Sequence, residues 1–189
     1  KTNAEDIRQL MNETTNGHCF RIDPRSALEV SEQERTSVYE AAWAKGGLQF
    51  RATFGDLLKD KKANDTAAEF IKTKIRQVVQ DPEKAALLSD IDHPFAAKRP
   101  PIDSHYFETF NRDNVSLVDI RSYPIERITP AGIKTSNADY ELDVIVFATG
   151  FDAMTGSLLR MNISGRQGLP LKDAWAAGPR TYLGLQIPK

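Results

Sequence analysis

Two adjacent basic residues, Lys98 and Arg99, form the motif of this sequence with the clearest chemical use. Pro100 and Pro101 follow them, and their rings stiffen the exit from the pair. A guanidinium keeps its proton, so Arg99 can stabilise an anion and the negative charge that develops when that anion attacks a carbonyl group. The ammonium of Lys98 can bind a phosphate. We select Arg99 as a candidate catalytic residue and Lys98 as a candidate cofactor-binding residue.

A second candidate lies at the end of a short apolar run. Residues 142–147 lead directly into Ala148-Thr149-Gly150. This pattern predicts a buried strand that ends in a tight turn where only small residues fit. Cofactors in open α/β sheets bind beyond the carboxyl ends of the strands. Thr149 and Gly150 are therefore candidate cofactor-binding residues.

The composition and the remaining motifs exclude several classes of function. The 189 residues carry a net charge of −1 and no basic stripe, so we expect no nucleic-acid partner. No stretch is long and apolar enough to predict a membrane span. The histidines are widely spaced and predict no metal site. A single cysteine, Cys19, excludes an intrachain disulfide and favours a reducing, cytoplasmic location.

Helix signals dominate the first half of the chain. The expected helix starts are the capping box Ser31-Glu32-Gln33-Glu34, a cap at Asn64 or Asp65, and the sequence Asp81-Pro82-Glu83. The first of these helices is expected to run to about residue 44, where two glycines follow. Residues 1–90 are therefore predicted to be mainly helical.

Short strand-like runs replace the helix signals from residue 95 onward. The expected strands lie at residues 115–119, 125–128, 133–135 and 141–147, and Pro130-Ala131-Gly132 supplies a turn. These strands predict a small β-meander that leads back into a larger, parallel sheet. The whole pattern is that of an α/β protein with a mainly helical part followed by a meander and a parallel-sheet strand.

Three further stretches, taken with residues 139–156, resemble the middle of a known enzyme family. They are residues 98–104, residues 106–115 and residues 175–184, the last beginning Trp175-Ala176-Ala177-Gly178-Pro179-Arg180. In this order and spacing they resemble the type I Baeyer–Villiger monooxygenases, flavoproteins with two dinucleotide-binding domains. These enzymes use FAD and NADPH to insert oxygen next to a ketone carbonyl. The resemblance is clearest over residues 95–186 and looser over residues 1–94.

The resemblance implies roles for the candidate residues and a division of the chain. Arg99 matches the catalytic arginine of the family, and Lys98 matches the lysine that holds the 2′-phosphate of NADPH. The turn at Thr149 and Gly150 matches the junction between the two cofactor domains. Residues 1–97 would form a helical insertion, residues 98–152 the C-terminal part of the NADPH-binding domain, and residues 153–189 the return into the FAD-binding domain.

No Gly-x-Gly-x-x-Gly fingerprint for either dinucleotide is present in the sequence. The chain also lacks an initial methionine and stops directly after a strand-like run. We therefore expect an internal piece of a longer enzyme, inactive and cofactor-free by itself. Its partners would be the remainder of the polypeptide, a ketone and molecular oxygen, so that FAD and NADPH bind only in the complete enzyme.

Two alternatives remain open at this stage. The chain could be a stable structural or proteolytic fragment with no activity of its own. It could also belong to another group of flavin monooxygenases, which oxidise nitrogen or sulfur and share the Ala-Thr-Gly turn. The Lys-Arg-Pro motif together with a long helical insertion favours the Baeyer–Villiger assignment over both.

Overall fold

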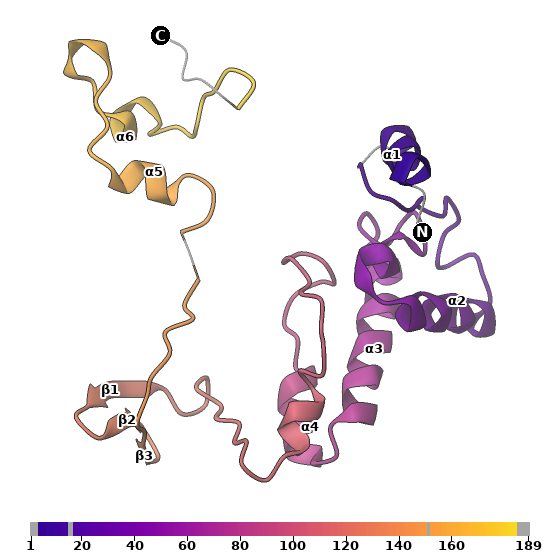
Figure 1. The fold of residues 1–189 in the computed structure, drawn as a ribbon, viewed down its shortest axis with the longest axis horizontal. Coiled ribbons are helices and arrows are strands. Elements are labelled where there is room, and N and C mark those ends of the chain that lie inside the picture. The colour runs from indigo at the N-terminus through magenta and orange to yellow at the C-terminus, as the bar shows by residue number, and fades with distance from the viewer. Residues whose placement is uncertain (1–3, 15–16, 151, 185–189) are drawn as a thin grey trace. The chain divides into compact units, whose positions relative to one another are not determined.

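Helices make up most of the first part of the chain, and three short strands follow them (Figure 1). The computed structural model describes residues 4–14, 17–150 and 152–184. The chain divides into two units, one up to Pro124 and one from Ile125. The first unit contains α1 (Ala4–Glu13), α2 (Glu32–Lys45), the short 3-10 helix η1 (Gly47–Ala52), α3 (Lys61–Val78), α4 (Pro82–Ser89) and the 3-10 helix η2 (Glu108–Asn111). The predicted helical character of residues 1–90 is confirmed.

The capping box at the start of α2 is only half formed. The Ser31 side chain accepts a hydrogen bond from the Glu34 N–H at 3.2 Å, as the sequence predicts. The Glu34 carboxylate forms an ion pair with the Arg25 guanidinium at 2.6 Å. Gly46, with φ of 70°, ends the helix and donates its N–H to the Trp43 carbonyl.

An aromatic core lies between α2, η1 and α3. The cluster of buried side chains consists of Ala27, Tyr39, Phe50, Phe54, Leu57, Ala63 and Ala67. The Tyr39 ring lies within 5.6 Å of the ring centroids of Phe50 and Phe54. Its hydroxyl is 2.7 Å from the Thr66 hydroxyl, and burial raises the pKa of Tyr39. This core holds the three elements together, because each contributes at least one of its buried side chains.

The third helix starts before the position expected from the sequence. Asp60 is its cap, because the Asp60 carboxylate accepts hydrogen bonds from the N–H groups of Lys62 and Ala63 at 2.7 and 3.0 Å. The prediction of a cap at Asn64 or Asp65 is wrong. Asn64 is buried inside the first turns of α3, and Asp65 forms an ion pair with Lys61.

Helices α3 and α4 lie side by side around a second, smaller cluster (Figure 1). Its buried members are Ile75, Val79 and Ala85. The predicted start of α4 is confirmed, because the Asp81 carboxylate accepts hydrogen bonds from the N–H groups of Glu83 and Lys84. A proline in the first turn needs no hydrogen-bond donor, so Pro82 fits there.

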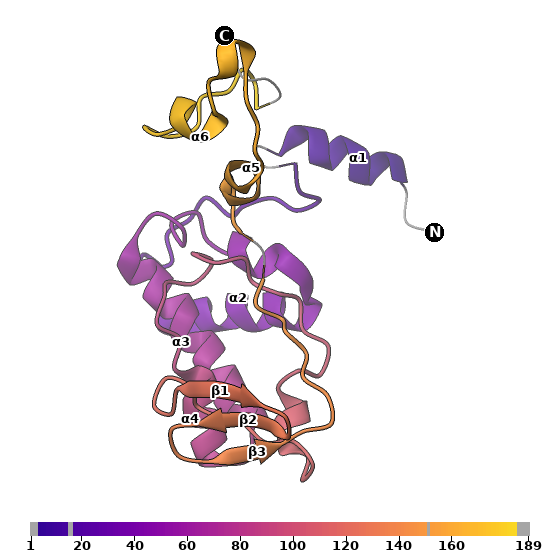
Figure 2. The same cartoon turned by 90° about the vertical axis from the view of Figure 1, so that its left-hand side faces the viewer.

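The second unit begins with an antiparallel meander. It contains β1 (Ile125–Thr129), β2 (Gly132–Thr135), β3 (Asp139–Glu141), α5 (Gly156–Arg160), the 3-10 helix η3 (Arg166–Gly168) and α6 (Leu171–Ala174). Figure 2 shows the strand order β1-β2-β3. Gly132 has a φ of 152°, and a Cβ there would overlap the Tyr140 carbonyl oxygen, so the turn requires glycine. The predicted strands at residues 125–128 and 133–135 are confirmed.

Two other predicted strands are absent from the described residues. Residues 115–119 form no strand. Residues 142–147 follow β3 as chain without strand pairing, and Val144 and Val146 are 74% and 83% exposed. The prediction of a buried strand is therefore wrong for the structure described. A strand with two apolar faces needs paired neighbours and covering layers, and the three-stranded meander ends at Glu141.

Candidate functional site

Lys98 and Arg99 lie on an irregular segment that follows α4. The segment leaves a turn at residues 94–97, in which the Ala97 N–H donates to the Pro94 carbonyl at 3.1 Å. Both basic side chains are exposed. Neither forms an ion pair or a hydrogen bond with any other residue that the structure describes. Their charges are therefore available to an anionic ligand.

The backbone after the pair is restricted by sequence. Arg99 and Pro100 each precede a proline, which disfavours helical backbone at both positions. The structure accordingly has no helix or strand between Lys98 and Asp103. The side chains of Lys98 and Arg99 thus lie on an irregular connection, which the two prolines restrict on its C-terminal side.

Thr149 and Gly150 lie at the end of the unpaired stretch that follows β3. Both are exposed. Gly150 has a φ of 82°, which favours glycine, and no neighbouring atom lies within 4 Å of the position a Cβ would take. The next residue, Phe151, is outside the described residues. The open surroundings leave space for a close approach of a ligand to this backbone.

The four candidate residues are divided between the two units. Lys98 and Arg99 belong to the first unit, and Thr149 and Gly150 belong to the second. The structure therefore gives each pair its own local geometry. The two members of each pair lie close together because they are adjacent in the sequence.

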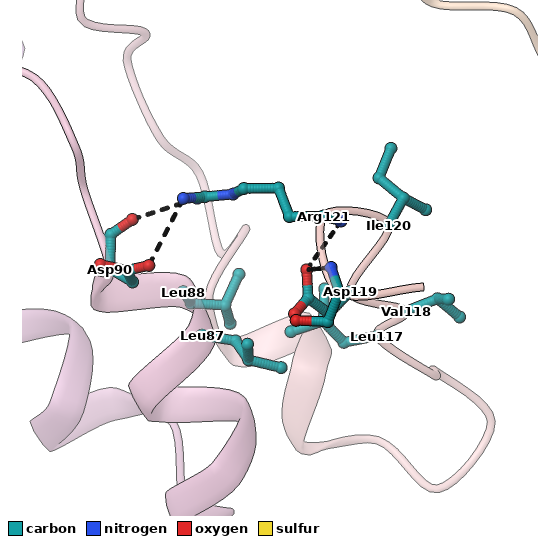
Figure 3. A pocket seen from close by; sticks show the side chains of 9 residues that line it. Leu87, Leu88, Asp90, Leu117, Val118, Asp119, Ile120 and Arg121 are labelled. Carbon is teal, nitrogen blue, oxygen red and sulfur yellow. Dashed lines mark hydrogen bonds and ion pairs between the residues drawn. The ribbon is translucent and has the colours of Figure 1, made fainter. Parts of the chain in front are cut away.

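A groove of about 360 Å³ lies beside the C-terminal part of α4 (Figure 3). Its lining combines apolar and polar residues: Leu87, Leu88, Asp90, Leu117, Val118, Asp119, Ile120, Arg121 and Ser122. None of the four candidate residues lines it. Sequence reasoning missed this groove, because it took residues 115–119 for a strand and the groove depends on their packing beside α4.

Polar groups at the rim of the groove bind one another. The Arg121 guanidinium lies 3.5 Å from the Asp90 carboxylate, as Figure 3 shows. Two hydrogen bonds lower the pKa of Asp119: the larger effect comes from the Ser122 side chain and the smaller from the Arg121 N–H. These groups have partners already, so the rim offers little unpaired charge to a ligand.

The described residues contain no group of three or more His, Cys, Asp or Glu side chains that could hold a metal ion. Cys19 is a free and exposed thiol. No helix in the described part of the chain is long and apolar enough to cross a membrane.

Lys98 and Arg99 have the donor chemistry that one of the two implied cofactors, NADPH, requires. The ammonium of Lys98 and the guanidinium of Arg99 are donors that bind phosphate well, and no carboxylate among the described residues neutralises them. The sequence has no glycine-rich turn to hold a pyrophosphate. The two side chains are therefore suitable donors for a phosphate group, and the sequence contains no pyrophosphate-binding turn beside them.

The chain is similar to several curated monooxygenases, and no family model matches it. It is 50% identical over 181 residues to 2-oxo-Δ3-4,5,5-trimethylcyclopentenylacetyl-CoA monooxygenase of Pseudomonas putida, covering 95% of this chain and 33% of that protein. It is 41% identical to a Baeyer–Villiger monooxygenase of Pseudooceanicola batsensis, covering 98% and 34%. A phenazine N-monooxygenase of Lysobacter antibioticus is also 41% identical, with the same two shares. The chain spans about a third of the length of these curated relatives.

A solved structure agrees with these matches. The crystal structure of OTEMO in complex with FAD and NADP superposes with a TM-score of 0.90 at 49% identity. The superposition covers 96% of this chain and 34% of that one. The local folds described above therefore match a segment of that larger structure.

Proposed function

Because the chain is a homologue of the Baeyer–Villiger monooxygenases along nearly all its length, we propose that it works as part of an FAD- and NADPH-dependent enzyme that inserts one oxygen atom next to a ketone carbonyl. The product is an ester or, from a cyclic ketone, a lactone. The observation that carries the proposal is the exposed pair Lys98 and Arg99, whose charges have no acidic partner in the described part of the chain. Bound FAD, once reduced by NADPH, would activate molecular oxygen, which is the source of the inserted atom.

Arg99 is the residue that acts on the reacting atoms in this proposal. Its guanidinium keeps its proton, so it stabilises an oxygen anion without protonating it and removing the nucleophile. Negative charge then develops on the former carbonyl oxygen of the ketone, and a donor held nearby stabilises it. An unpaired arginine suits both tasks, since an ion pair within the protein would compete for its donors.

Lys98, Thr149 and Gly150 bind cofactor in this proposal. The Lys98 ammonium binds the 2′-phosphate of NADPH as a point charge. Thr149 and Gly150 let the backbone come close to a cofactor where the chain passes from one cofactor domain to the other, because Gly150 has no side chain and a positive φ.

The proposed division of the chain follows from these roles. Residues 1–97 form the helical insertion, residues 98–152 complete the NADPH-binding domain, and residues 153–189 return to the FAD-binding domain. The two units separated at Pro124 reflect packing within the chain and are a different division. The partners of the chain are the rest of the enzyme, a ketone and oxygen, and the free thiol of Cys19 favours the cytoplasm.

Replacing Arg99 tests the proposal directly. The full-length protein, loaded with FAD, is given NADPH and a panel of cyclic ketones under ¹⁸O₂, and the products are analysed by mass spectrometry. We expect a lactone that carries one heavy oxygen atom. We expect Arg99→Ala to abolish that product while FAD absorbance remains, because the guanidinium acts on the reaction and FAD binding rests on other groups.

Arg127→Ala is the matched control, since Arg127 is also an exposed arginine but lies on β1 of the meander. It should leave lactone formation unchanged. Lactone formation retained by Arg99→Ala would refute the catalytic role. A protein that forms no lactone or ester from any ketone would refute the proposed function.

N-oxidation is the second candidate, because a relative with this chemistry in its name is as similar as one of the Baeyer–Villiger enzymes. The same assay separates the two. An aromatic N-heterocycle such as phenazine is offered in place of the ketone, and the N-oxide is measured. Formation of the N-oxide without any lactone would favour this candidate.

A further inference from the structure

One buried asparagine holds the start of the segment that carries Lys98 and Arg99. Asn64, only 5% exposed, lies in α3 and is far from Phe95 in the sequence. Its side-chain oxygen accepts the Phe95 N–H at 2.8 Å, and its side-chain nitrogen donates to the Phe95 carbonyl at 2.9 Å. The same nitrogen donates to the Leu57 carbonyl at 2.7 Å. The amide group of one side chain therefore binds both backbone groups of Phe95.

Phe95 is also held by its ring. The ring meets that of Phe50 edge to face, with the centroids 5.5 Å apart, at the margin of the aromatic core. A residue bound through its N–H, its carbonyl and its ring has very little freedom to move. Phe95 is thus a fixed point from which the chain continues to the basic pair.

The connection from this fixed point to Arg99 is short and restricted. Ala96 has a φ of 63°, which is unusual for a residue with a side chain and shows that its surroundings impose the backbone. The Ala97 N–H closes the turn onto the Pro94 carbonyl. The prolines after Arg99 restrict the backbone on the other side. The backbone is therefore restricted on both sides of the Lys98-Arg99 pair.

We infer that Asn64 is a positioning residue, which sets the place of Arg99 by fixing the backbone of Phe95. This inference rests on the proposed function, because it concerns the same site. A misplacement of about 1 Å in a catalytic group can cost roughly a hundredfold in rate, so a clamp at the start of the segment has a functional consequence. Asn64 acts through Arg99 and does not itself touch the substrate.

A second asparagine provides a matched control. The Asn111 side chain donates to the Val78 carbonyl at 2.8 Å and accepts the Gln80 N–H at 2.8 Å. It is the same kind of clamp, and it holds the connection between α3 and α4. Asn111 lies well beyond Arg99 in the chain, so its loss should destabilise the fold without releasing Phe95.

The experiment compares Asn64→Ala with Asn111→Ala in the FAD-loaded, full-length protein. The readout is the amount of lactone formed per NADPH consumed, which does not depend on how much of the protein is folded. We expect both substitutions to lower the midpoint of thermal unfolding. Only Asn64→Ala should lower the lactone yield per NADPH, by roughly tenfold or more, because a displaced Arg99 no longer serves the product-forming step.

A glycine inserted between Ala97 and Lys98 covers the case in which Asn64→Ala does not fold. This insertion lies in an exposed stretch, leaves the clamp intact and displaces Arg99, so it should lower the same ratio. An unchanged ratio in the folded Asn64 variant, or in the insertion variant, would overturn the inference. An equal fall of the lactone yield per NADPH in Asn64→Ala and Asn111→Ala would also overturn the inference, because it would show that the effect comes from general loss of structure. If the unsubstituted protein forms lactone but the variants do not behave as expected, the positioning role of Asn64 is refuted and the proposed function stands. If the unsubstituted protein forms no lactone, both the positioning role and the proposed function are refuted.

Discussion

At the scale of single residues, two of the three predicted helix starts are confirmed, and the third is wrong. Ser31 and Asp81 cap their helices as predicted, since each carboxylate or hydroxyl binds N–H groups two or three residues ahead. Asn64 has the same capping chemistry, yet it binds Phe95 from inside α3. The chemistry of the side chain is visible in the sequence, and the identity of a distant partner is not.

Lys98 is the residue through which nicotinamide cofactor selectivity can be tested. We expect Lys98→Ala to raise KM for NADPH by about ten- to a hundredfold and to change KM for NADH little, because only NADPH carries the 2′-phosphate. Steady-state kinetics with both cofactors measure the effect. Lys59→Ala, another exposed lysine, is the control and should change neither KM. Equal changes for both cofactors would contradict the assignment.

Asp23 gives a prediction about pH. Its hydrogen bonds with Arg25 lower the pKa of the carboxyl group in the folded protein. A carboxyl group whose pKa is lower in the folded protein stabilises the fold at pH values above its pKa in the unfolded chain, which is about 3.9. This stabilisation disappears as the pH falls through the pKa of the folded state. Asp23→Asn should therefore lower the thermal midpoint at pH 7 and have a diminishing effect toward about pH 2. Thermal melts of both proteins from pH 7 to about pH 2 measure this effect. A constant difference between the two thermal midpoints over this range would contradict the prediction.

At the scale of elements, the order of α2, α3 and α4 was predictable, whereas the start of α3 and the burial of the residues before it were not. The start of α3 moved to Asp60 because this residue alone presents its carboxylate to free N–H groups of the first turn. Neighbouring leucines just before α3 show the same limit. Leu57 is fully buried and Leu58 is 54% exposed, although both have the same side chain and the same local sequence.

These two leucines form a matched pair for testing the core. Leu57→Ala should lower the free energy of unfolding by about 2–5 kcal/mol, because it opens a cavity in the aromatic core. Leu58→Ala should cost less than about 0.5 kcal/mol, since water already contacts that side chain. Chemical denaturation of both variants measures the difference. Similar losses for the two would mean that Leu58 is covered in the protein in solution.

At the scale of the whole molecule, residues 142–147 form an apolar segment that has no strand partner among the described residues. The alternation places Val144 and Val146 on one side and Ile145 and Phe147 on the other, so both faces are apolar. Such a strand belongs inside a parallel sheet. The relatives are about three times as long as the segment that this chain matches.

Substituting threonine for Val144 and Val146 together tests this interpretation. The 189-residue chain by itself should aggregate less, because fewer apolar side chains remain on an unpaired strand. The full-length protein should instead lose roughly 1–3 kcal/mol of stability for each buried hydroxyl group. Light scattering of the chain and denaturation of the full-length protein are the measurements. A full-length protein of unchanged stability would show that this strand is not buried.

The sequence by itself predicted the resemblance to a known enzyme family, two of the three helix starts, the turn at Gly132 and the basic pair at Lys98 and Arg99. All of these depend on residue type and on partners close along the chain, or on a long pattern of matched positions. Only the tertiary structure decided that Asn64 clamps Phe95, that Leu57 is buried beside an exposed Leu58, and that residues 142–147 have no paired strand in the described chain. The physical reason is that burial and pairing depend on segments far apart in sequence, whose meeting local propensity does not specify.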